Sequence, residues 1–170
     1  LYFGQNDGTL MSVDYAERYP IFTVACGPAN SIRGAAYLSG MQDGIITDVG
    51  GTTTDVGALS DGFPRESAVA VEIGGVKTNF RMPDLISIGL GGGSIVGDED
   101  SEVTVGPDSV GYEIVSKARV FGGDVTTATD VALELGRGSF GTTNANLSDE
   151  LVDAASDVIV ERVERKIDEM

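Results

Sequence analysis

The chain has 170 residues, 24 of them glycine, and carries 27 acidic against 11 basic side chains, for a formal net charge of −16. With 41% hydrophobic residues it can bury a core, which excludes a disordered segment and leads us to expect one domain over residues 1–170. The charge would repel nucleic-acid phosphates, which argues against a nucleic-acid partner. No apolar run reaches the roughly 18 residues of a membrane span.

The acidic excess has two interpretations that the sequence leaves open. Dispersed carboxylates with only three lysines serve solubility, or they adapt the protein to high salt, where they keep its surface hydrated and their repulsion is screened. The single cysteine, Cys26, excludes an internal disulfide and is consistent with a cytoplasmic location. Because a strand pattern begins at Leu1, we expect the chain to be an internal fragment of a longer protein.

The first half of the chain predicts short strands around two helices. Ser12 is the predicted N-cap of a short helix through Arg18, and Cys26-Gly27-Pro28 turns into a helix over Ala29–Ser39, whose small residues allow close packing on a sheet. Turn residues such as Asn6-Asp7-Gly8 separate the strands. In chain order the predicted strands are Leu1–Gln5, Ile21–Ala25, Gly44–Asp48, Thr53–Ser60, Ser67–Ile73 and Asp84–Gly89.

The second half is mainly helical. A short strand is predicted at Val103–Gly106, Ser109–Phe121 is ambiguous, and a helix is predicted over Thr127–Gly136 with Gly136 as C-cap. A final helix runs from Ser148 toward Met170, with one apolar face that packs into the core: Leu151, Ala155, Val158, Ile159, Val163 and Ile167. These elements indicate an α/β fold, a mixed sheet flanked by helices.

The stretch Asp48-Val49-Gly50-Gly51-Thr52-Thr53-Thr54-Asp55-Val56 joins two predicted strands. A Gly-Gly turn lets backbone N–H groups point outward together, and such a nest suits phosphate oxygens. The threonine hydroxyls can donate to the same oxygens. An aspartate at the end of the preceding strand, Asp48, can hold Mg²⁺ or position an attacking water. The alternative is an ordinary hairpin turn with polar threonines.

A second glycine run, Gly89-Leu90-Gly91-Gly92-Gly93-Ser94, is neither a Walker A loop nor a dinucleotide fingerprint. Two interpretations stay open: Gly91, Gly92, Gly93 and Ser94 line a binding site, or the run is a backbone crossing that only glycine fits. Arg33 and Arg81 could contact substrate or phosphate, although solvated or structural roles are more common for arginine. The chain has no histidine, so Cys26 has no Cys–His partner within it.

The Asp48–Val56 stretch resembles the phosphate motif of the superfamily of actin, sugar kinases and heat-shock chaperone ATPases. Further segments, in matching order, are similar to the hydantoinase A and oxoprolinase family: Cys26-Gly27-Pro28-Ala29, Ile88–Ile95, Val105-Gly106-Pro107-Asp108-Ser109, and Thr129-Asp130 with Leu135-Gly136. Cys26 stands where the family usually has serine. A first Asp-x-Gly-Gly-Thr motif and a later Gly-Gly-Ala-Gly-Pro stretch of the family are absent.

The resemblance implies an actin-like (ribonuclease H-like) fold, of which this chain is the middle part of a bilobed ATPase. It implies ATP and Mg²⁺ as cofactors, with Asp48 as the catalytic and magnesium-binding residue. Gly50, Gly51, Thr52 and Thr53 would bind phosphate, and Asp55 would fix the loop, with a magnesium role left open.

The implied activity is the ATP-dependent opening of a cyclic amide of the hydantoin or 5-oxoproline type, with a second hydantoinase-type subunit as partner. The alternatives are a carboxylase subunit that activates a ketone, and a non-catalytic, chaperone-like ATPase switch. The isolated fragment is expected to be inactive.

Overall fold

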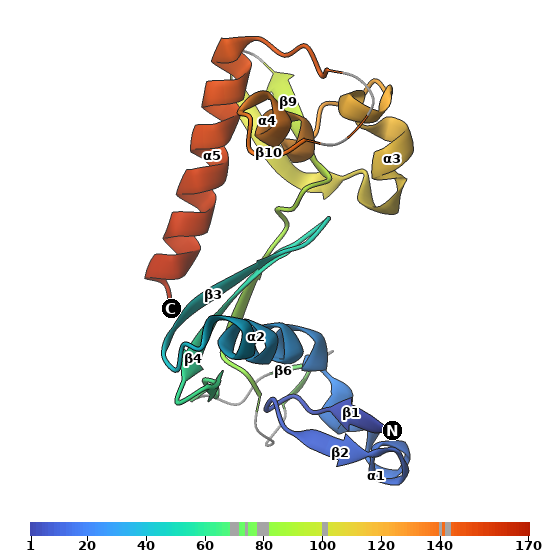
Figure 1. The fold of residues 1–170 in the computed structure, drawn as a ribbon, viewed down its shortest axis with the longest axis vertical. Helices are drawn as coiled ribbons and strands as arrows, with labels where there is room; N and C mark the ends of the chain where they lie inside the picture. Colours follow the sequence, from blue (N-terminus) through green and yellow to red (C-terminus); the bar gives the residue numbers. More distant parts are fainter. Residues whose placement is uncertain (69–71, 74, 78–81, 100–101, 140, 142–143) are drawn as a thin grey trace. The chain divides into compact units, whose positions relative to one another are not determined.

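The computed structural model describes residues 1–170 except 69–71, 74, 78–81, 100–101, 140 and 142–143 (Figure 1). The chain divides into two compact units. The first comprises Leu1–Asp48, Asp55–Ile86 and Met170, and the second comprises Val49–Thr54 and Ser87–Glu169. The single domain expected from the sequence stays a prediction.

The first unit begins with two short antiparallel strands, β1 (Tyr2–Gly4) and β2 (Leu10–Ser12), followed by helix α1 (Val13–Arg18). Ser12 is the N-cap, as predicted: its side chain accepts a hydrogen bond from the Tyr15 N–H at 3.3 Å. The next element contradicts the sequence prediction.

A strand was predicted at Ile21–Ala25, but Pro20–Thr23 forms the 3₁₀-helix η1. Pro20 fixes φ for a helical first turn. The rings of Tyr15, Tyr19 and Phe22 also pack together, with centroids 4.9 to 6.4 Å apart, and this packing favours a curled backbone over an extended one.

Helix α2 (Cys26–Ser39) starts three residues before the predicted Ala29. Pro28 lies in its first turn, where a missing N–H costs nothing because the first N–H groups of a helix have no partner. Gly40 ends the helix with a left-handed φ of 73°. The helix packs its buried face on the sheet through a small core cluster: Ile32, Ala36 and Leu59, with Ile46 and Leu85 against it.

The sheet of the first unit is built around β3 (Gly44–Val49) and β4 (Thr54–Ser60), in the order β3-β4-β5, with β5 at Phe63–Pro64. β8 (Leu85–Ile88) pairs with β4. Only four residues connect β3 to β4, and parallel neighbours need a connection of about a dozen. The two strands are therefore antiparallel, as predicted.

Two further short strands, β6 (Glu72–Ile73) and β7 (Val76–Lys77), pair with each other in antiparallel fashion. Of the predicted strand Ser67–Ile73, residues 69–71 lie outside the described residues, and only Glu72–Ile73 is strand.

The second unit contains the antiparallel pair β9 (Ser94–Glu99) and β10 (Glu102–Ser109), whose register shifts between Val105 and Ser109. The sequence prediction missed β9 and covered only part of β10. The ambiguous segment after β10 forms three short helices, η2 (Gly111–Glu113), α3 (Ile114–Lys117) and η3 (Arg119–Phe121).

Two longer helices complete this unit. Helix α4 (Ala128–Glu134) begins with a capping box of Thr127 and Asp130. Its C-cap is Leu135 and not the predicted Gly136, which follows with a left-handed φ of 69°. Helix α5 (Asp149–Asp168) is the long helix in red (Figure 1). Ser148, where the helix was predicted to begin, is its N-cap.

The apolar face of α5 packs into the core of the second unit. The predicted residues Leu151, Ala155, Val158, Ile159 and Val163 belong to this core, whereas the predicted Ile167 does not. The strands and α4 supply the rest of the cluster: Ile88, Leu90, Val96, Val105 and Val131. In the described part of the chain, no helix is both long and apolar enough to cross a membrane.

Candidate phosphate-binding turn

The turn Gly50–Thr53 connects β3 to β4 and is exposed along its whole length. The Gly50 N–H donates to the Thr53 carbonyl at 2.9 Å, so Gly51 and Thr52 form the tip of a tight hairpin. A Cβ atom on Gly51 would meet nothing within 4 Å. Within the described residues, the N–H groups of Gly51, Thr52 and Thr53 have no hydrogen-bond acceptor. Three consecutive donors at an open turn are therefore available to an anion.

Asp48 and Asp55 flank this turn on the two strands, and both are half-buried. The Gly50–Thr53 hydrogen bond sets a register that places Asp48 opposite Asp55. Carboxylates directly opposite one another on a hairpin repel, so a nearby cation or donor stabilises the pair.

The described residues contain no group of three or more acidic or cysteine side chains that could hold a metal ion. A Mg²⁺ ion at this hairpin would thus rely on water and phosphate oxygens for most of its ligands, which is its usual preference.

The glycine run Gly91–Gly93 packs directly against the turn. The N–H groups of Gly92 and Gly93 donate to the carbonyls of Gly50 and Gly51 at 3.0 and 2.7 Å. A Cβ atom on Gly91 would lie 2.7 Å from the Gly50 carbonyl oxygen and from two further backbone atoms of the turn. The run is therefore a backbone crossing that requires glycine. It holds the carbonyls of Gly50 and Gly51 by hydrogen bonds. The predicted ligand-binding role of Gly91, Gly92 and Gly93 stays a prediction.

Further hydrogen bonds hold the crossing in place. Ser94 is fully buried, and its hydroxyl accepts from the Gly91 N–H at 2.9 Å, so in this conformation it braces the loop internally. The Thr54 hydroxyl, also fully buried, donates to the Leu90 carbonyl at 2.7 Å. The carbonyl of Gly92 accepts from the Thr129 N–H at 2.9 Å, which links the crossing to the first turn of α4.

Arg162 on α5 is a structural residue that the sequence analysis missed. Its guanidinium donates to the carbonyls of Val105 and Gly89, at the base of the glycine run. A signal for it exists in the sequence, since Arg162 is a charged residue between Ile159 and Val163 on an otherwise apolar helix face.

The predicted arginine contacts lie elsewhere. Arg33 belongs to the first unit, where its guanidinium stacks 3.9 Å from the centroid of the Phe63 ring and donates to the Gly62 carbonyl. Arg81 lies outside the described residues. Arg33 therefore has a structural role in this conformation, and it is not part of the turn.

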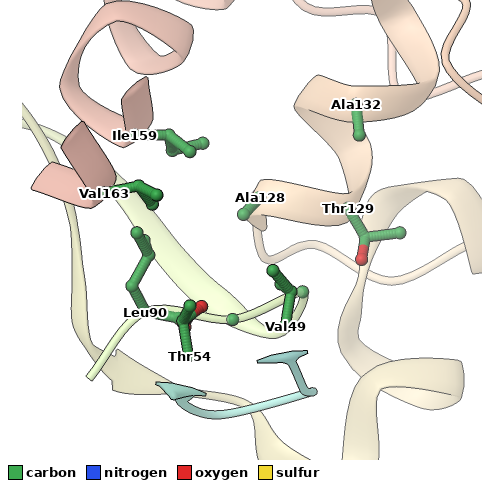
Figure 2. A pocket seen from close by; sticks show the side chains of 10 residues that line it. Val49, Thr54, Leu90, Ala128, Thr129, Ala132, Ile159 and Val163 are labelled. Atoms are coloured by element: carbon green, nitrogen blue, oxygen red, sulfur yellow. The ribbon is translucent and has the colours of Figure 1, made fainter. Parts of the chain in front are cut away.

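A pocket of about 220 Å³ lies beside the turn in the second unit. Figure 2 shows Ile159 and Val163 of α5 on one side and Ala128, Thr129 and Ala132 of α4 on the other. Val49, Thr54, Leu90, Gly91 and Gly92 complete the wall. None of these residues is charged, and the polar side chains among them are the two threonines.

Comparison with known proteins places this arrangement in a family of enzymes. The sequence model described as "Hydantoinase/oxoprolinase" matches residues 1–170, and the chain belongs to this family. It is 30% identical over 151 residues to an uncharacterised protein of Methanocaldococcus jannaschii, covering 80% of this chain and 22% of that protein.

Two relatives carry names that describe an activity. The chain is 33% identical over 115 residues to the acetophenone carboxylase gamma subunit of Aromatoleum aromaticum, covering 65% of this chain and 16% of the relative. It is also 33% identical over 141 residues to the 5-oxoprolinase of Saccharomyces cerevisiae, covering 79% of this chain and 10% of the relative.

Solved structures show the same fold. Nucleotide-free acetone carboxylase, from a study of ATP-dependent acetone carboxylation, matches with a TM-score of 0.63 at 22% identity over 96% of this chain. The ATP-dependent caprolactamase of Pseudomonas jessenii matches with a TM-score of 0.53 at 26% identity over 79% of this chain. The chain spans 24% and 20% of these two structures, and it likewise spans 22% or less of the relatives named above.

Proposed function

We propose that this chain is the phosphate-binding part of an actin-like, ribonuclease H-like ATPase in a longer, bilobed protein, and that this protein activates a carbonyl group with ATP and Mg²⁺. The observation that carries the proposal is the exposed turn, where the N–H groups of Gly51, Thr52 and Thr53 have no acceptor within the described residues, while the glycine run hydrogen-bonds to the carbonyls of Gly50 and Gly51. The ATP dependence of acetone carboxylation and of the caprolactamase, the two proteins of similar structure, supports it.

The residues of the hairpin fit a nucleotide phosphate. Consecutive backbone donors at a glycine turn form an anion-binding nest, and the exposed hydroxyls of Thr52 and Thr53 add donors without steric hindrance. Asp48, at the end of β3, supplies a carboxylate for Mg²⁺ or for an attacking water. Asp55 on the facing strand fixes the loop or shares the cation.

The proposed reaction is phosphoryl transfer to a carbonyl oxygen. A bond forms between that oxygen and the terminal phosphorus of ATP, the bond from this phosphorus to the bridging oxygen breaks, and ADP leaves. The amide nitrogen of a lactam, or the α-carbon of a ketone, gives up a proton to a base. Such transfers depend mainly on positioning and charge stabilisation, which a backbone nest and Mg²⁺ provide.

Two substrate classes follow from the relatives. The similarity to 5-oxoprolinase supports a hydrolase that opens a cyclic amide of the hydantoin or 5-oxoproline type. A second hydantoinase-type subunit and a cytoplasmic location are part of this proposal. The similarity to acetophenone and acetone carboxylase subunits supports a ketone-activating subunit as the second candidate.

The test is the Asp48→Asn variant of the full-length protein. Asn keeps the shape of the side chain but can neither neutralise Mg²⁺ nor accept a proton, so carbonyl-dependent ATP hydrolysis should fall at least about a hundredfold. The melting temperature should change little. The matched control is Asp157→Asn, an exposed position on α5, which should retain full activity.

Near-normal turnover by a folded Asp48→Asn protein would remove Asp48 from the mechanism. ATP hydrolysis that no carbonyl compound stimulates would instead favour the chaperone-like switch.

A further inference from the structure

The pocket beside the turn (Figure 2) is lined in part by the residues that hold the turn in place. Val49, which directly precedes Gly50, forms one wall, and Gly91 and Gly92, which pack against Gly50 and Gly51, form another. A molecule in this pocket would therefore lie beside the turn. An apolar cavity with a few polar groups at one edge is the usual form of a small-molecule site.

The chemistry of the lining is almost entirely apolar. Of its two hydroxyl groups, that of Thr54 is already donated to the Leu90 carbonyl, which leaves Thr129 as the polar side chain free to face a ligand. Moving an ionised carboxylate from water into such surroundings without a partner carries a large free-energy cost. The lining thus selects against an anionic ligand.

Among the described residues of the second unit, no basic side chain belongs to the lining of this pocket. Lys117 donates to Glu113 at 2.8 Å, a hydrogen bond that raises the pKa of its ammonium group, and Lys166 donates to Glu169. Arg162 holds backbone carbonyls. Arg137 lines a smaller hollow of about 100 Å³ between α4 and α5, which adjoins the pocket and shares Ala128, Ala132 and Ile159 with it. Among the described residues that line the larger pocket, none could pair with a carboxylate.

We infer that this pocket holds the carbon skeleton of a neutral carbonyl compound, so that the substrate is an uncharged lactam or ketone and not a cyclic amide with a free carboxylate. The inference rests on the proposed function and refines it. The pocket has a volume of about 220 Å³, roughly seven times the liquid volume of one water molecule. This volume has room for a small lactam or ketone. The carbonyl oxygen would then face the turn, and the carbon atoms would contact Ile159, Val163 and Ala132.

The first experiment measures ATP hydrolysis by the full-length protein with four probes: ε-caprolactam, acetone, acetophenone and 5-oxoproline. We expect kcat/KM for the best neutral probe to exceed that for 5-oxoproline at least tenfold. Saturation-transfer NMR gives a readout that does not depend on turnover. The neutral probe should show transfer from the protein, and 5-oxoproline should not.

The second experiment fills the pocket. Ala132→Leu should lower kcat/KM for the preferred neutral probe at least tenfold and weaken its NMR signal, with the KM for ATP unchanged within twofold. Ala154→Leu adds the same atoms to α5 outside the pocket and should change neither value. If Ala132→Leu does not fold, Val163→Ala takes its place; it enlarges the pocket and should shift the preference from acetone toward acetophenone.

Several outcomes would overturn the inference. A preference for 5-oxoproline that is lost in Arg137→Ala would place a carboxylate near the other hollow. An Ala132→Leu protein with unchanged carbonyl kinetics would show that another group, such as a further part of the protein, covers the pocket. In both cases loss of turnover in Asp48→Asn would leave the proposed function standing. If no carbonyl probe stimulates ATP hydrolysis, the inference and the proposed function both fail.

Discussion

The turn Gly50–Thr53 and the run Gly91–Gly93 are two glycine-rich segments of the second unit, and their glycines lie in opposite surroundings. At Gly51 a Cβ atom would meet nothing within 4 Å, and the neighbouring N–H groups are open to solvent. At Gly91 a Cβ atom would lie 2.7 Å from three backbone atoms of the turn. The second segment needs glycine for close backbone packing, whereas in the proposed site the first would need it for access by a ligand.

The difference shows how an exposed turn is kept rigid. The run donates two backbone hydrogen bonds to the turn carbonyls. The Thr54 hydroxyl also donates a hydrogen bond to the carbonyl of Leu90, the residue directly before the run. With the carbonyls of Gly50 and Gly51 held, the exposed turn keeps the N–H groups of Gly51, Thr52 and Thr53 without an acceptor among the described residues. Such preorganisation lowers the cost of ordering the site on binding. The comparison can be tested from the largest expected change in stability to the smallest.

The largest effect is expected for Gly91→Ala. The new methyl group would collide with the backbone of Gly50, Gly51 and Thr52, none of which can move without breaking the crossing. The free energy of unfolding should fall by about 3 kcal/mol, at the upper end of the usual overpacking range. Denaturant titration of the wild type and variant measures this free energy. A decrease of less than about 0.5 kcal/mol would contradict the close packing of Gly91 on the turn.

Thr54→Val should have an intermediate effect. It removes the donor of a fully buried hydrogen bond and leaves the Leu90 carbonyl without that bond, at a cost of about 1.5 kcal/mol. Thr54→Ser keeps the hydroxyl and loses only a methyl group. If the hydrogen bond matters, the serine variant is the more stable of the two in denaturant titration. The reverse order would show that packing by the methyl group dominates.

Salt should have a smaller effect, spread over the whole molecule. The formal net charge of −16 disfavours the compact state through self-repulsion, and salt screens that repulsion. If the acidic excess reflects a saline cytoplasm, the melting temperature should rise by at least about 3 °C between low and molar KCl, or about 1 kcal/mol. A neutral osmolyte at equal osmolality is the control, and a flat profile in KCl would favour the solubility interpretation.

Gly51→Ala should leave stability nearly unchanged while affecting ligand binding. Its backbone φ lies outside the left-handed region and the space around it is open, so the free energy of unfolding should change by less than about 0.5 kcal/mol. The methyl group would stand where a phosphate oxygen approaches the nest, and the KM for ATP of the full-length protein should rise about tenfold. An unchanged KM would place the phosphate elsewhere.

Local features were predictable from sequence because they depend on residues within a few positions of one another. Ser12 and Ser148 cap their helices through N–H groups three residues ahead, and the Thr127–Asp130 capping box has the same short reach. The Gly50-Gly51 turn between two strands follows from local backbone preferences. The motifs around it led to the hydantoinase/oxoprolinase family, which the family comparison confirms.

Other features depend on partners far away in the sequence, and only the tertiary structure decided them. The role of Gly91–Gly93 depends on contacts about forty residues away, with Gly50, Gly51 and Thr52. Arg162 lies 73 residues from the Gly89 carbonyl that it holds. Sequence determined which backbone groups could bind a phosphate, and tertiary packing decided which remained open to it, because a donor already bound within the protein is not available to a ligand.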